Sequence, residues 1–98
     1  AIRAGKEAAA ERCRALVEEN EQDTNLLYDW FLRNGICEVR ETYTDSEALL
    51  WHLQNVGETL KELLQHSKVL SLRLYGEPSE EVLAALSGLP VEVYAPFY

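Results

Sequence analysis

An Asn-Gly pair between two apolar runs constrains the fold of this chain more than any other feature. Asn34 and Gly35 separate residues 25–32 from residues 36–43, and both runs alternate between apolar and polar side chains. A type I′ turn needs positive φ at both of its central positions, which Asn and Gly adopt readily. The pair therefore predicts a β-hairpin with a two-residue loop.

A loop of those two residues alone sets the register of the whole hairpin. It places Tyr28 opposite Glu41 and Leu26 opposite Tyr43. One face of the hairpin is then nearly all apolar or aromatic, with a single charge: Leu26, Tyr28, Trp30, Leu32, Cys37, Val39, Glu41 and Tyr43. Such a face needs a cover, and the flanking segments supply one.

Two helices are expected on either side of the hairpin. Residues 6–20 are rich in strong helix formers, with a narrow apolar side of Ala9, Cys13, Leu16 and Val17. Residues 45–65 form the second expected helix, and Thr44 to Glu47 match a capping box at its start. Apolar residues then recur at spacings of three and four, which is typical of one buried helix face: Leu49, Leu53, Val56, Leu60, Leu63 and Leu64. Gly57 is expected either to kink this helix or to split it in two.

The remaining segments predict two more strands and a short helix. Residues 68–75 alternate as a strand, residues 76–79 form a turn into a short helix that stops at Gly88, and residues 91–98 form an edge strand containing Pro96. The order predicts one α+β domain over residues 1–98 with a ferredoxin-like split βαβ arrangement, its helices on one face of an antiparallel sheet. Its first strand is expected to lie upstream of Ala1.

The opposite sheet face predicts a partner. Leu27 and Phe31 would otherwise meet water, so we expect a homodimer packed sheet to sheet. Trp51 lies about 160° from the centre of the leucine stripe, and we expect it at a subunit contact because Trp is enriched at interfaces.

Charge and cysteine usage narrow the class of protein. The net charge is −8, which argues against nucleic acid or an anionic membrane as a partner. Cys13 and Cys37 have no metal-ligand spacing around them, and we expect both to be buried thiols in a cytoplasmic protein. No apolar run is long enough to span a bilayer.

Several short strings resemble the antibiotic biosynthesis monooxygenase (ABM) family of the dimeric α/β-barrel superfamily. They are residues 27–30, residues 41–48, His52, residues 55–57 and residues 74–79, and the resemblance extends over about residues 4–98. It implies a dimeric barrel and, in some members, a cofactor-independent oxygenase acting on quinols or anthrones. The haem-degrading branch uses separated Trp and His residues, whereas Trp51 and His52 are adjacent here.

His52 is the candidate catalytic residue. It lies about 60° from the centre of the helix stripe, from where it can overlook the aromatic sheet face, and imidazole is a natural proton acceptor near neutral pH. Alternatively, it packs at the helix edge and bonds a neighbour. The substrate-binding candidates are Tyr28, Trp30, Glu41, Tyr43 and Asn55. Aromatic residues at such positions are more often part of the core than ligand contacts, and the alternative for Glu41 is a carboxylate paired with nearby donors.

Two functions follow from these residues. The first is a monooxygenase without cofactor or metal that oxidises a small aromatic substrate with dioxygen. The second is a non-catalytic dimeric protein that binds a hydrophobic ligand or a protein partner. No glycine loop or dinucleotide-binding pattern is present to suggest another chemistry.

Overall fold

The Asn34-Gly35 turn forms as predicted and fixes the hairpin. The computed structural model describes residues 2–97, and both turn residues have positive φ, 49° for Asn34 and 78° for Gly35. Strand β1 (Asn25–Arg33) pairs antiparallel with β2 (Ile36–Tyr43), and Tyr28 faces Glu41 as expected.

The register departs from the prediction at the first end of β1. A shift between Asn25 and Leu27 brings Asn25, rather than Leu26, opposite Tyr43. The expected Leu26–Tyr43 pair is therefore wrong. The backbone N–H of Asn25 donates to the carbonyl of Glu21 at 3.0 Å, so the turn before β1 holds Asn25 and displaces the ladder by one residue.

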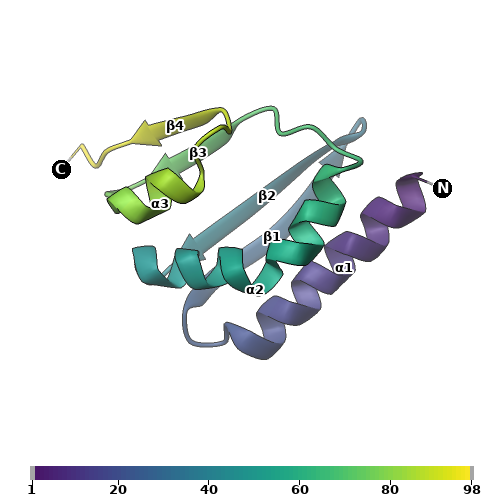
Figure 1. Cartoon of the computed structure of the whole chain (residues 1–98), viewed down its shortest axis with the longest axis horizontal. Coiled ribbons are helices and arrows are strands. Elements are labelled where there is room, and N and C mark those ends of the chain that lie inside the picture. Colours follow the sequence, from purple (N-terminus) through teal and green to yellow (C-terminus); the bar gives the residue numbers. More distant parts are fainter. Residues whose placement is uncertain (1, 98) are drawn as a thin grey trace.

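Two antiparallel helices cover one face of the hairpin, as Figure 1 shows. Helix α1 (Ile2–Asn20) contacts α2 (Ser46–Leu64), and their contacts run in opposite order along the two helices, from Arg12–Glu62 to Asn20–Trp51. The small side chains predicted for α1 pack closely, with Cys13 and Val17 buried against Val56. Tyr28 and Trp30 lie beneath this cluster, as expected for the inner sheet face.

The N-cap of helix α2 lies one residue later than the capping box predicted. Asp45, not Thr44, is the N-cap, and its side chain accepts a hydrogen bond from the backbone N–H of Ala48. Gly57 does not split the helix, because α2 runs without interruption from Ser46 to Leu64, but Figure 1 shows that the axis of α2 bends partway along its length.

The C-terminal part forms a second, separate sheet. Strand β3 (Leu72–Tyr75), helix α3 (Glu80–Ala85) and strand β4 (Val91–Tyr94) follow in order, and β3 pairs with β4 in parallel. The α+β class is confirmed. The single antiparallel sheet is wrong for the residues described, which form two sheets of two strands each. The helical crossover through α3 returns the chain to the starting end of β3, and this makes the pair parallel.

The helices leave much of the hairpin uncovered. On the outer face, Leu27 is 41% and Phe31 is 52% exposed, as expected for a face without a partner in this chain. Cys37 lies near the hairpin tip and is exposed, so its predicted burial is wrong, whereas Cys13 is buried. None of the helices in residues 2–97 is long and apolar enough to cross a membrane.

Candidate functional site

His52 lies on the most buried line of α2. Ala48, His52 and Val56 follow one another at four-residue spacing, and all three are buried. His52 is only 4% exposed. The expectation that it borders the apolar stripe was wrong, because α1 packs along this line and turns the leucines to a half-buried position.

A buried carboxylate that the sequence analysis missed contacts His52. Glu21 directly follows α1 and is 1% exposed, the least exposed acidic residue described. Both of its carboxylate oxygens lie 3.0 Å from His52 Nδ1. The sequence contained a signal for this residue. Glu21 continues the four-residue spacing of Ala9, Cys13 and Val17, and this spacing predicts that its carboxylate lies on the buried side of the helix.

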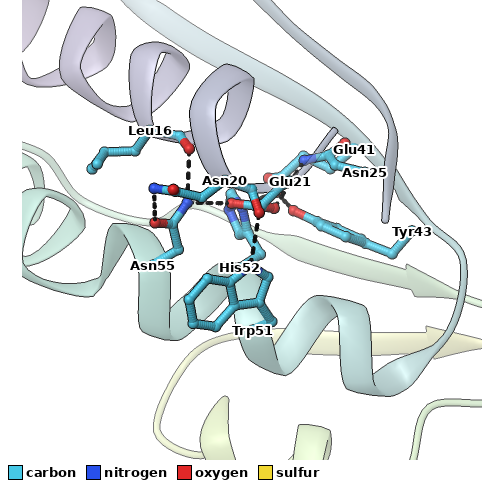
Figure 2. A network of polar contacts seen from close by, with 9 residues as sticks. All are labelled: Leu16, Asn20, Glu21, Asn25, Glu41, Tyr43, Trp51, His52 and Asn55. Atoms are coloured by element: carbon cyan, nitrogen blue, oxygen red, sulfur yellow. Dashed lines mark hydrogen bonds and ion pairs between the residues drawn. The ribbon is translucent and has the colours of Figure 1, made fainter. Parts of the chain in front are cut away.

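Two asparagines also point donors at Glu21, as Figure 2 shows. Asn55 Nδ2 donates to Glu21 Oε2 at 2.8 Å, and Asn25 Nδ2 donates to Glu21 Oε1 at 3.3 Å. The amide of Asn55 also donates to the carbonyl of Leu16 and accepts from Asn20. Asn55 thus ties α2 to α1 and lies on the Glu21 side of His52.

The other ring nitrogen of His52 faces the sheet. His52 Nε2 lies 3.2 Å from Glu41 Oε1, and the hydroxyl of Tyr43 donates to the same oxygen. Glu41 and Tyr43 lie two residues apart in β2, so the alternation of the strand puts both on one face. We call Glu21, His52, Glu41, Tyr43 and Asn55 the His52 cluster.

Aromatic rings enclose the imidazole. The ring centroids of Tyr28 and Tyr43 lie 5.3 and 5.2 Å from that of His52, and Trp30 lies 5.9 Å from Tyr28. Burial raises the pKa of both tyrosine hydroxyls above their ordinary range, and the charge of Glu41 adds to the effect. Both hydroxyls therefore stay protonated, and that of Tyr43 donates to Glu41. The indole nitrogen of Trp30 is buried without a hydrogen-bond partner.

Trp51 lies beside the cluster without joining it. It is 42% exposed, and its indole nitrogen donates to the carbonyl of Asn20 at 3.1 Å. The chain itself therefore holds one edge of this ring against the end of α1, while the rest is accessible to a partner.

Two surface hollows lie away from the His52 cluster. One is bordered by the end of α2 and the segment before β4, including Leu64, Leu70 and Pro90; the other lies at the hairpin tip beside Phe31 and Ile36. Neither includes a member of the cluster.

The cluster has the composition of a proton-transfer site rather than a metal site. No group of three or more His, Cys, Asp or Glu side chains within residues 2–97 is arranged to hold a metal ion. One imidazole between two carboxylates, with a tyrosine hydroxyl on the outer one, can instead take up and release a proton. No protein-family model matches the chain, and no curated protein and no solved structure matches it either.

Proposed function

We propose that this protein is a cofactor-independent monooxygenase that oxidises a small quinol-like or anthrone-like substrate with dioxygen, as the resemblance to the ABM family implies. One observation supports the proposal above the others. His52 lies between two carboxylates, 3.0 Å from Glu21 and 3.2 Å from Glu41, and against two tyrosine rings. This places a proton-accepting group in an aromatic environment suited to a planar substrate.

The chemistry needs a base and little else. His52 takes a proton from the hydroxyl or activated carbon of the substrate, and the resulting anion gives electrons to dioxygen. For an anthrone-type CH₂ group, a C–O bond forms, the second oxygen leaves as water, and the carbon becomes a carbonyl. The two hydrogens of the carbon and one oxygen atom make up that water, so no external reductant is required.

Glu41 and Tyr43 occupy the position at which the substrate oxygen is expected. Glu41 Oε1 contacts His52 Nε2 and accepts from the Tyr43 hydroxyl. An oxygen of the substrate that displaces this carboxylate inherits both contacts. Because the raised pKa of Tyr43 keeps its hydroxyl protonated, Tyr43 stabilises the negative charge that develops on that oxygen.

Oxygen consumption tests the proposal. Purified protein with a panel of hydroquinones and anthrones is expected to consume oxygen, and His52→Ala is expected to lower the rate by at least about a hundredfold, the usual range for a general base. His66→Ala is the matched control because His66 is exposed at the end of α2. Background uptake by the wild type, or equal rates for the two variants, refutes the proposed reaction.

A second function is favoured by the burial of the cluster. His52 is 4% exposed, both of its nitrogens have partners, and the two hollows lie elsewhere. These features suit a non-catalytic protein in which the cluster holds the fold together and a hydrophobic ligand or protein partner binds at another surface. Thermal stabilisation by phenolic ligands without oxygen uptake, unchanged in His52→Ala, supports this second function over the first.

The proposed assembly is a homodimer in which two ferredoxin-like chains pack through their outer sheet faces into a barrel, in the cytoplasm. The exposure of Leu27 and Phe31 supports it, since both are large apolar residues on one side of β1. Sedimentation at micromolar concentration is expected to give about twice the chain mass of 11.2 kDa. A species of the single-chain mass refutes this assembly.

A further inference from the structure

We propose that Glu21 is a positioning residue that holds a proton on His52 Nδ1, so that every proton exchange of this histidine runs through Nε2. The inference deepens the proposed function and rests on it for its kinetic part. Its structural part concerns the protein alone and is tested without substrate.

Three side-chain donors converge on Glu21, as Figure 2 shows. They are His52 Nδ1 at 3.0 Å from both oxygens, Asn55 Nδ2 at 2.8 Å from Oε2, and Asn25 Nδ2 at 3.3 Å from Oε1. An asparagine Nδ2 can only donate, so each of the two oxygens of Glu21 already acts as an acceptor. An ionised carboxylate is the side chain that accepts at both positions and still accepts from His52.

The position of Glu21 is held by its backbone as well. Its N–H donates to the carbonyl of Val17 at 2.9 Å, and its own carbonyl accepts from the N–H groups of Thr24 and Asn25. The side chain is 0% exposed, so water does not compete for the imidazole. The carboxylate therefore keeps one orientation toward Nδ1.

This arrangement decides which ring nitrogen of His52 exchanges a proton. A neutral imidazole carries one N–H, and a carboxylate at Nδ1 selects the form with the proton there. The lone pair is then on Nε2. Because Glu41 Oε1, 3.2 Å away, is itself an acceptor, this neutral form needs Glu41 moved aside, as when a substrate oxygen displaces it. When His52 carries two protons, Nε2–H donates to Glu41 and Nδ1–H still donates to Glu21. In both states the Nδ1 proton stays, and the proton that moves is on the side of Glu41 and Tyr43.

Glu21→Gln is expected to remove the preference for a proton on His52 Nδ1. A glutamine has one oxygen, and the shorter of the two asparagine contacts, from Asn55, draws it to the Oε2 position. The amide NH₂ then takes the Oε1 position. Because both positions lie 3.0 Å from Nδ1, this nitrogen now meets one donor and one acceptor. A neutral His52 is then no longer held with its proton on Nδ1, and the form protonated at Nε2 is expected to be populated as well.

Long-range ¹H–¹⁵N correlation spectra of histidine-labelled protein test this directly. The chain has two histidines, so His66→Ala assigns the signals. We expect wild-type His52 to show a protonated Nδ1 at every pH at which the protein is folded, and Glu21→Gln to show a neutral ring with a clear fraction protonated at Nε2. Glu19→Gln, which alters an exposed carboxylate two residues away, is expected to match the wild type. A neutral wild-type ring protonated at Nε2 overturns the inference even if Glu21→Gln does not fold.

Kinetics separate this inference from the proposed reaction. With a substrate that the wild type oxidises, Glu21→Gln is expected to lower kcat by about tenfold or more with little change in KM, because part of the histidine then has the wrong tautomer. Normal kcat in that variant overturns the role of Glu21. If the wild type consumes no oxygen but its spectra are as expected, the reaction fails while the control of the Nδ1 proton by Glu21 is supported.

Discussion

Replacing Glu21 by alanine is expected to destabilise the fold by about 3–5 kcal/mol, the cost of breaking a buried ion pair and leaving one partner unpaired. The structure leads to the same range by counting contacts. Glu21 accepts from His52, Asn55 and Asn25, and a hydrogen bond to a charged group is worth about 1.5–3 kcal/mol. The Asn25 contact is long, so two strong bonds account for most of the loss.

Glu62→Ala is a matched control in which burial, rather than distance, decides the result. Glu62 Oε2 lies 2.7 Å from Arg12 Nη2, closer than Glu21 lies to His52, but the two side chains are 51% and 47% exposed. Exposed ion pairs contribute only about 0–1 kcal/mol, because water and salt screen them. Distance alone ranks the Glu62 pair as the stronger one, whereas burial ranks it far below the Glu21 pair.

Urea denaturation followed by circular dichroism measures both variants. With a slope of about 1–2 kcal/mol per molar urea, a loss of 4 kcal/mol lowers the midpoint by about 2–4 M. Glu62→Ala is expected to lower it by less than about 1 M. Equal midpoints for the two variants would refute the reasoning, since they would mean that water reaches position 21 and that the His52–Glu21 pair behaves as a surface pair.

Three further measurements probe other parts of the molecule. Burial keeps the pKa of Tyr43 above its value of about 10 in the unfolded chain. The unfolded state therefore loses the proton first, and the stability of the fold decreases above about pH 10. Tyr43→Phe is expected to reduce this decrease, as measured by urea denaturation from pH 9 to 11. Gly35→Ala is expected to cost about 1–2 kcal/mol because φ is positive there, whereas Gly57→Ala, in open space within α2, is expected to stabilise by about 0.5–1 kcal/mol; equal effects would contradict the turn geometry. Phe31→Glu is expected to halve the sedimenting mass without unfolding the chain, and an unchanged mass would place the contact elsewhere.

The hairpin could be predicted because its signal is local. Asn34 and Gly35 require the backbone that the turn provides, and the register of seven of the eight pairs follows from the loop length. The slip at Asn25 could not be predicted in the same way. It depends on a hydrogen bond from Asn25 to Glu21, in a turn whose residues are polar and carry no periodic pattern.

The pairing of β3 with β4 could not be predicted from the sequence. Alternation in residues 68–75 and 91–98 predicts extended chain, but it does not say which edge each strand joins. The structure has only Leu72–Tyr75 and Val91–Tyr94 as strands, in a parallel pair of their own. Strand length and partner are set by tertiary contacts that no short segment encodes.

Half of the site followed from the hairpin register. Tyr28, Glu41 and Tyr43 lie on one sheet face because of it, and the helix that follows brings His52 over that face. Glu21 is 31 residues away from His52, and no local motif joins them. The useful signal was that Glu21 has the same four-residue spacing as the buried residues of α1. Helix propensity alone does not reveal this, because an acidic residue at this place looks like part of the polar end of a helix.

The burial of this ion pair bears on function because stability alone does not explain it. Well-packed apolar side chains at positions 21 and 52 would fill the same space, and such replacements of buried ion pairs are often neutral or stabilising. What they could not provide is a fixed proton on Nδ1 and a lone pair directed from Nε2. The side chains of Glu21 and His52 are 0% and 5% exposed, whereas that of Glu41 is 29% exposed. The accessible side of the cluster is therefore the side on which Nε2, Glu41 and Tyr43 meet, and a ligand that exchanges a proton with His52 has to displace Glu41 there.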